Sequence, residues 1–176
     1  MDISFRKLIT PNAEIARIIS EWENDSELIP LIRPNFTKEA LALRQEITVE
    51  TLSERLKYIQ IYLIFVDGKM VGEMNYQIDP QHLYLKEKRS AWIGIYIGDR
   101  SVHGKGVGTR AMKYLEEEIK RAGLKRIELG VFEYNRNAMA LYQKMGYQEI
   151  GRIDGFTYWK GKMWQDIRME IRFKEK

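Results

Sequence analysis

The fold of this chain is decided by residues 91–123, which are AWIGIYIGDRSVHGKGVGTRAMKYLEEEIKRAG. Residues 91–97 are almost continuously apolar, which predicts a strand buried on both faces. After a glycine-rich turn at residues 102–109, apolar side chains recur at helical spacing, as Met112, Leu115, Ile119 and Ala122. Alternating glycines let a backbone approach a ligand closely, and the start of a helix presents unpaired N–H groups to anions. The segment therefore predicts a phosphate-binding turn between a buried strand and an amphipathic helix.

Two familiar phosphate loops do not fit this turn. A P-loop requires Ser or Thr after its Gly-Lys pair, whereas Gly106 follows Lys105. A dinucleotide fingerprint requires a third glycine where Thr109 stands, and the strands before the turn predict a hairpin instead of a parallel start. A tight turn without a ligand remains the alternative interpretation.

The rest of the chain predicts further strands and helices around this segment. Residues 61–66 and 70–78 flank Asp67-Gly68, which is a strong hairpin signal. Thr10-Pro11 is typical of a helix start, and spacing predicts helices over residues 11–23, 37–46, 49–60 and 136–145. Alternating or apolar residues predict three more strands, over residues 127–131, 148–158 and 163–173. We expect one α/β (α+β) domain over residues 1–176, with helices packed on a sheet that begins antiparallel.

Composition limits the kind of protein. The chain has 176 residues, of which 44% are hydrophobic and 31% charged, and it contains no cysteine. Disulfide scaffolds, thiolate metal sites and cysteine nucleophiles are therefore excluded. No apolar run reaches the roughly 20 residues of a membrane helix, and residues 1–8 lack a signal-peptide core, so we expect a cytoplasmic protein without a membrane partner. Its two histidines, His82 and His103, lie far from any spaced carboxylate pair, so we expect no metal site.

Charge is unevenly distributed along the sequence. Residues 1–60 carry 8 basic and 10 acidic side chains, whereas residues 61–176 carry 21 basic and 15 acidic ones. The balance of −2 against +6 suits a polyanionic ligand on the second part and a cationic one near the first, although an ordinary solvated surface gives the same count. The lysines do not form a block, so we expect no nucleic-acid partner.

A second motif makes the glycine turn more specific. Residues 135–147 have the pattern N-x-x-A-x-x-L-Y-x-x-x-G-Y, and the turn itself has the pattern H-x-x-G-x-G. Together with the buried strand, they resemble the GNAT superfamily of N-acetyltransferases over residues 60–173. Trp22-Glu23-Asn24-Asp25 and the ending around Gln165-Asp166 resemble the branch that contains ribosomal-protein and spermidine acetyltransferases.

The resemblance implies a fold and an activity. The fold is a mixed, mostly antiparallel sheet of six to seven strands, flanked by helices, with a splayed central strand pair. Residues 1–60 are implied to be a helical acceptor-side region, and residues 61–176 the cofactor-binding core. The implied reaction is direct transfer of acetyl from acetyl-CoA to a primary amine, which can be a polyamine, an aminoglycoside or a protein N-terminal amine. Direct transfer agrees with the absence of cysteine.

The resemblance also implies which residues form the site. Acetyl-CoA is expected to contact the end of the buried strand, the glycine turn and the second motif, at Tyr96, Ile97, His103, Gly104, Lys105, Gly106, Val107, Gly108, Thr109, Asn135 and Lys144. Tyr142 matches the general acid that protonates the departing CoA thiolate. A phenol suits this role, because its ordinary pKa near 10 keeps it protonated until the thiolate forms.

Two residues depart from the family pattern. His103 stands where Gln or Arg usually opens the turn, so one phosphate contact becomes pH-sensitive or is lost. Trp92 stands where some members have a catalytic Glu, so another group or a water chain must deprotonate the amine. Glu73, on the neighbouring strand, is the first candidate for this base, and Asp79 and Glu128 are further candidates.

Other features leave alternatives open. Four acidic residues of the first part either attract a cationic acceptor or are solvated charge; they are Glu21, Glu23, Asp25 and Glu27. Aromatic side chains of the last two strands favour a homodimer; they are Phe156, Tyr158, Trp159 and Trp164. A non-catalytic, CoA-binding regulatory module is the alternative to an enzyme.

Overall fold

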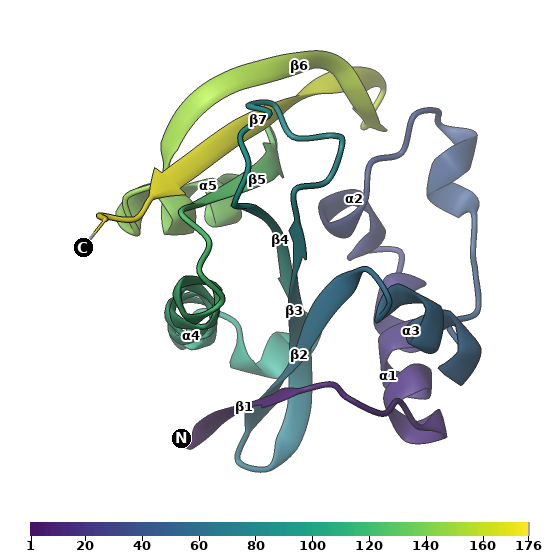
Figure 1. The fold of residues 1–176 in the computed structure, drawn as a ribbon. Coiled ribbons are helices and arrows are strands. Elements are labelled where there is room, and N and C mark those ends of the chain that lie inside the picture. Colours follow the sequence, from purple (N-terminus) through teal and green to yellow (C-terminus); the bar gives the residue numbers. More distant parts are fainter. Residues whose placement is uncertain (176) are drawn as a thin grey trace.

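The computed structural model describes residues 1–175 (Figure 1). Its elements, in chain order, are β1 (Ile3–Lys7), α1 (Ala13–Glu23), α2 (Ile29–Ile32), the 3-10 helix η1 (Glu39–Ala42), α3 (Val49–Arg55), β2 (Ile59–Val66), β3 (Lys69–Ile78), β4 (Ser90–Ile97), the 3-10 helix η2 (Arg100–Val102), α4 (Val107–Arg121), β5 (Arg126–Phe132), α5 (Arg136–Lys144), β6 (Gln148–Trp159) and β7 (Lys162–Arg172). Within the described residues, none of the helices is both long and apolar enough to cross a membrane.

The strands form one seven-stranded sheet in the order β1-β2-β3-β4-β5-β7-β6. Neighbouring strands are antiparallel except for the central pair β4 and β5, which is parallel. This pair is short, because it extends only from Ser90 opposite Arg126 to Trp92 opposite Glu128. Beyond those residues β4 and β5 separate, which leaves their facing backbone groups free. The predicted mixed sheet with a splayed central pair is therefore confirmed.

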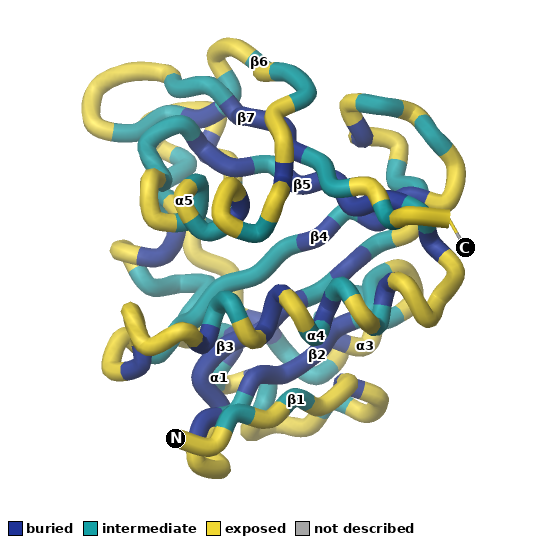
Figure 2. The backbone as a smooth tube through the Cα atoms, turned by 90° about the vertical axis from the view of Figure 1, so that its left-hand side faces the viewer, coloured by how far each residue is buried: buried dark blue, intermediate teal, exposed yellow. Residues whose placement is uncertain are grey.

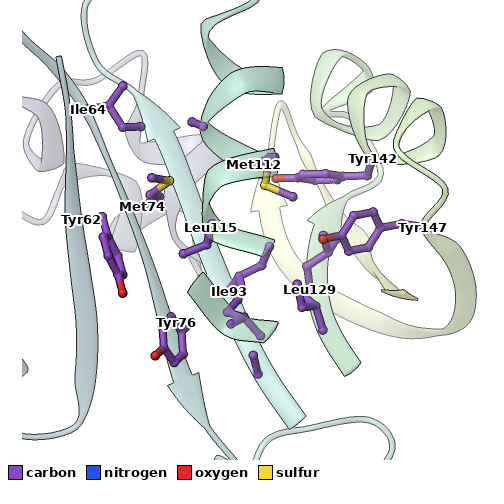
Figure 3. Close-up of a cluster of buried hydrophobic side chains, with 14 of the residues drawn as sticks. Tyr62, Ile64, Met74, Tyr76, Ile93, Met112, Leu115, Leu129, Tyr142 and Tyr147 are labelled. Carbon is purple, nitrogen blue, oxygen red and sulfur yellow. The ribbon is translucent and has the colours of Figure 1, made fainter. Parts of the chain in front are cut away.

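Helices cover both faces of the sheet (Figure 1). On one face, α4 packs its apolar stripe, which includes Met112 and Leu115, against Met74 and Ile93 of the central strands (Figure 3). On the other face, Ile19 of α1 and other apolar side chains of α1 and α3 pack against β2. Figure 2 shows the effect of this packing on α4, along which buried and exposed residues alternate. The predicted amphipathic helix is confirmed, and so are Met112, Leu115 and Ile119 of its buried stripe. Ala122 is exposed instead, because the helix ends there and Ala122 is its C-cap.

The hairpin that joins β2 and β3 turns at Asp67 and Gly68, as predicted. Both residues have positive φ, of 49° and 80°, which is the backbone of a type I′ turn. Helices α4 and α5 also agree with their predicted positions, and Gly123 follows α4 with a φ of 82°. These features depend on neighbouring residues, which explains why spacing alone located them.

The N-terminal part differs from its prediction in several places. Strand β1 was not predicted, because its five residues become a strand only by pairing with β2. Helix α1 is capped by Asn12, whose side chain accepts a hydrogen bond from Ile15 N–H, and not by Thr10. The helix predicted over residues 49–60 ends at Arg55, because the residues from Ile59 onward pair with β3. The helix predicted over residues 37–46 is reduced to η1.

Candidate active site

The glycine turn leads from the end of β4 into α4. Gly104 and Gly106 have φ values of 74° and 81°, a conformation that strongly favours glycine. Gly106 is the N-cap of α4, and no side chain caps this end of the helix. A Cβ atom at either glycine would meet no other atom within 4 Å, so both positions face open space. The first N–H groups of α4 are thus available to an anion.

His103 is directed toward the strand and not outward. Its Nε2 is 2.8 Å from the carbonyl oxygen of Ile97, the last residue of β4. The imidazole therefore ties the turn to the end of the strand. Because the His103 side chain is held in this way, anion binding would depend on the backbone N–H groups of the turn.

Basic side chains surround the turn. Lys105, Arg110 and Lys144 are exposed, and within residues 1–175 none of them forms an ion pair. Lys144 ends α5, which packs beside the turn, since a Cβ at Gly108 would lie 3.4 Å from Leu141 Cδ2. Lys105 and Arg110 are thus within a few residues of the helix start, where their charge favours a polyanion such as a pyrophosphate.

Asn135 caps α5. Its Oδ1 accepts a hydrogen bond of 3.3 Å from Ala138 N–H. No other described residue contacts its amide nitrogen at hydrogen-bond distance, so this donor is available to a ligand. The structure therefore gives Asn135 a capping role at the start of α5 that the sequence analysis did not predict, although Asn is a preferred N-cap residue.

Tyr142 lies on α5 in the cluster that includes Met112 and Tyr147 (Figure 3). Its ring centroid is 5.9 Å from that of Tyr147, and the residue is only 8% exposed. Burial raises the pKa of Tyr142 to about 12. Among the described residues its hydroxyl has no hydrogen-bond partner. The phenol is therefore a protonated, uncommitted donor at neutral pH.

Glu73 lies on β3 opposite Tyr96 of β4, on the sheet face that α1 and α3 cover. It is buried, and its Oε1 accepts a hydrogen bond of 2.8 Å from Asn75. Burial, reinforced by the nearby charge of Glu23, raises the pKa of Glu73. The hydroxyl of Tyr96 is buried close by and has no hydrogen-bond partner in the described chain.

The other two candidate bases have structural partners. Glu128 is fully buried, and its carboxylate binds the N–H groups of Tyr84 and Leu85 at 2.7 and 3.1 Å as well as the side chains of Arg126 and Arg168. Asp79 accepts hydrogen bonds from the backbone N–H groups of Arg89 and Ser90, so it closes the loop of residues 80–89. Both carboxylates hold this loop on the sheet, which leaves Glu73 as the least committed of the three.

Each member of the acidic cluster near the N-terminus has an arginine partner. Glu21 pairs with Arg17 at 2.6 Å, and Glu23 pairs with Arg55 at 2.7 Å. Asp25 and Glu27 both pair with Arg100, at 3.0 and 2.8 Å. This compensation reduces the attraction that the cluster exerts on a cationic molecule.

Sequence reasoning missed a buried charged group on the face of the sheet that also carries Glu73. Asp166 of β7 is 2% exposed and accepts a 2.8 Å hydrogen bond from Arg168 Nε at its Oδ2. Its side chain lies next to Gly130 of β5. The sequence carried a signal, because charges alternate along both β5 and β7. Alternation alone does not show that this charged face is buried, and the loop of residues 80–89 contributes to its burial through contacts with Glu128 and Arg168.

Comparison with known proteins identifies the family that this arrangement matches. The model of the family described as "Acetyltransferase (GNAT) family" matches residues 19–147. Spermine/spermidine N(1)-acetyltransferase of Bacillus subtilis (strain 168) is 30% identical over 92 residues, which are 52% of this chain and 60% of that protein. Thialysine N-epsilon-acetyltransferase of Bos taurus is 32% identical over 73 residues, which are 38% of this chain and 43% of that protein. The matched region thus spans 60% or less of the length of these curated relatives.

Solved structures share the fold over almost the whole chain. The ribosomal-protein-alanine N-acetyltransferase from Brucella melitensis superposes with a TM-score of 0.76 at 16% identity, over 97% of this chain and 99% of that one. The spermidine N-acetyltransferase from Vibrio cholerae, in complex with CoA and spermine, superposes with a TM-score of 0.73 at 19% identity, over 97% of this chain and 95% of that one. At these identities the likeness establishes the fold.

Proposed function

We propose, because the chain belongs to the acetyltransferase (GNAT) family, that it transfers the acetyl group of acetyl-CoA directly to a primary amine. One observation carries this proposal. The uncapped start of α4 lies in a glycine turn at the end of β4, where β4 and β5 have separated, and α5 packs Tyr142 beside it. Anion site, free strand edge and proton donor are the three parts that acyl transfer from a phosphate-bearing thioester requires.

The residues around the turn fit the cosubstrate. Backbone N–H groups of residues 103–109, with Lys105 and Lys144 nearby, would hold the pyrophosphate. The free edge of β4 at Tyr96 and Ile97 would pair with the amide groups of the pantetheine arm, and the amide of Asn135 would contact the same arm. A backbone N–H of this edge would polarise the thioester carbonyl.

Two side chains would move protons in this reaction. Glu73 accepts one proton of the acceptor ammonium along a chain of water molecules, and its raised pKa makes the carboxylate a better base. The amine nitrogen then attacks the thioester carbon and loses its second proton to solvent as the C–N bond forms. As the C–S bond breaks, Tyr142 donates its proton to sulfur and regains one from solvent. The overall reaction converts an ammonium ion and a thioester into an amide, a thiol and one released proton.

Relatives supply two classes of acceptor to compare. The Bacillus relative is named for spermine and spermidine, and the Vibrio structure contains spermine, which favours a polyamine. The fold is similarly close to that of an enzyme named ribosomal-protein-alanine N-acetyltransferase. Because the acidic cluster near α1 is paired with arginines, we propose a primary amine as the class and do not restrict it to polyamines.

The proposal is tested by following thiol release from acetyl-CoA in the presence of a panel of amines. The panel contains spermidine, an aminoglycoside and peptides with a free N-terminus. We expect at least one of them to accelerate thiol release and to be recovered as its N-acetyl product. If CoA binds but no amine accelerates thiol release, the protein is a CoA-binding regulatory module and not an enzyme.

We also propose that the protein acts in the cytoplasm and forms a homodimer through β6, which is an edge strand of the sheet. Several aromatic side chains of this hairpin pack within the chain, as Trp159 does on Tyr134 at a centroid distance of 4.3 Å. The dimer proposal therefore rests on the strand edge, and sedimentation equilibrium tests it.

A further inference from the structure

Only one of the two carboxylate oxygens of Asp166 has a hydrogen-bond partner in the described chain. Oδ2 accepts the hydrogen bond from Arg168 Nε, whereas Oδ1 is buried and has no hydrogen-bond partner among residues 1–175. An unpaired buried oxygen of this kind destabilises the folded state and calls for an explanation. Burial raises the pKa of Asp166, although Arg168 opposes this effect.

The neighbouring buried carboxylate shows that the oxygen of Asp166 is exceptional. Glu128 uses both of its oxygens fully, since Oε1 binds Leu85 N–H and Arg126 while Oε2 binds Tyr84 N–H and Arg168. Arg126 is likewise shared among Glu128, Glu170 and backbone or hydroxyl oxygens of the covering loop. Structural needs therefore account for the rest of this buried network and leave Oδ1 of Asp166 available.

The free oxygen lies at the gap between β4 and β5. Asp166 is opposite Phe132 in the sheet, and its side chain leans across β5 to Gly130. Gly130 lies beyond Glu128, the last β5 residue that pairs with β4. A Cβ at Gly130 would be 2.7 Å from Oδ2, 3.0 Å from Oδ1 and 3.0 Å from the Trp92 ring. The missing side chain thus leaves the room that the carboxylate and the Trp92 ring occupy beside the separated strands.

The surroundings define the chemistry of a ligand for this oxygen. The ring of Trp92 lies 4.7 Å from the guanidinium carbon of Arg168 and 4.6 Å from the ring of His82, so an apolar wall stands beside the carboxylate. Arg168 fixes the orientation of the carboxylate through Oδ2. An oriented acceptor oxygen against an aromatic wall suits one ammonium group attached to an apolar stem.

We propose that Oδ1 of Asp166 binds the ammonium group of the acceptor amine at the gap between β4 and β5. This inference rests on the proposed acetyltransferase function and adds the acceptor-binding residue to it. Asp166 holds the amine beside the free strand edge, where the thioester carbonyl would lie, while Glu73 remains the proton acceptor. The interaction between the ammonium group and the Asp166 carboxylate is strong because the carboxylate is already desolvated and oriented before the amine arrives.

The experiment compares amine binding by the unaltered protein and by Asp166→Asn, each saturated with CoA. Spermidine, phenethylamine and alanine amide are titrated by calorimetry as probes of three amine classes. Asparagine has the same shape but no charge, so every amine that the unaltered protein binds should bind the variant at least about 10-fold more weakly. CoA affinity should stay within about 2-fold, and in turnover the KM for the amine should rise while kcat changes little.

Two further variants keep the test decisive. Asp154→Asn removes an exposed carboxylate from β6, which pairs with β7, and should leave amine binding unchanged. Gly130→Ala keeps the charge of Asp166, but its Cβ atom would meet Oδ2 at 2.7 Å and displace the carboxylate, so it should also weaken amine binding even if Asp166→Asn does not fold. Unchanged amine affinity in Asp166→Asn, or in Gly130→Ala when the first variant is unfolded, overturns the inference.

The outcomes separate this inference from the proposed function. If the unaltered protein acetylates an amine and Asp166→Asn shows the same KM, only the role of Asp166 is wrong. If the unaltered protein binds amines through Asp166 but transfers no acetyl group, the proposed function is wrong. If it binds none of the three amines, the ammonium site is overturned.

Discussion

At the scale of single residues, burial prepares both proposed proton-transfer groups for opposite tasks. It raises the pKa of Tyr142 to about 12, which keeps a donor protonated, and it raises the pKa of Glu73, which strengthens a base. The same physical cause therefore serves both roles, since desolvation disfavours the charged form of every acid.

Tyr142→Phe should lower kcat about 100-fold or more without changing CoA affinity. The substitution removes only a hydroxyl that has no partner in the described structure, so the fold is retained. Steady-state kinetics and CoA titration measure the two effects. Undiminished turnover with a good acceptor would remove Tyr142 from the acid role.

Glu73→Gln should raise the melting temperature at pH 7 while lowering turnover. Because the folded pKa of Glu73 lies above its ordinary value of 4.5, the folded state binds a proton more tightly than the unfolded one. The stability linked to that proton is complete below pH 4.5 and is lost as pH rises through the folded pKa. The stabilising effect of the substitution should therefore disappear at pH 4. A melting temperature equally raised at pH 4 and pH 7 contradicts this account.

At the scale of elements, the site depends on how β4, the turn and α4 are joined. Gly106 is both the N-cap of α4 and a left-handed residue, so the helix can begin immediately after the turn with its N–H groups facing outward. His103 ties the same turn to Ile97 at the end of β4. The anion site and the strand edge are thus held in one rigid connection.

Gly106→Val should reduce CoA affinity at least about 10-fold, because a β-branched residue resists positive φ and covers the helix start. Gly161→Val is the matched control, since Gly161 has a φ of 84° in the turn before β7 and also faces open space. Both variants should lose roughly 1–2 kcal/mol of stability, but only the first should lose CoA binding. Equal CoA affinity in the two variants would show that the turn does not hold the phosphates.

At the scale of the whole molecule, buried charges join segments that are distant in sequence. Arg126 of β5 is 0% exposed and binds Glu128, Glu170 of β7 and Ser90 at the start of β4. The covering loop of residues 80–89 is attached through Glu128. One network therefore holds the two sides of the central gap and the loop above it in place.

Arg126→Met should destabilise the protein by about 3–5 kcal/mol and lower its Tm by roughly 10 °C, because it leaves Glu128 buried without its main partner. Arg121→Met is the control, since the Arg121–Glu118 pair lies on the exposed side of α4 and contributes little. Thermal unfolding followed by circular dichroism compares the two. Similar melting temperatures would contradict a stabilising role for the network.

Local spacing was sufficient for much of the fold around the candidate site. The Asp67-Gly68 hairpin, the stripe of α4 except for Ala122, and the glycine turn before the helix were predicted correctly, because each depends on residues within a few positions of one another. Strand β1 was missed, since pairing with β2 decides it, and α3 was predicted too long for the same reason.

Only the tertiary structure decided which partners the charged side chains have. Nothing near Asp166 in the sequence indicates that Arg168 would bind one oxygen, or that the other would be buried beside Gly130 of another strand without a hydrogen-bond partner in the described chain. The pairing of Asp25 with Arg100 is equally invisible in the sequence. The sequence alone determined a glycine turn before a helix and a phenol at a fixed spacing from it, because these are local patterns. Burial, pKa and the partners of a charge depend on which distant segments meet, and folding alone brings those together.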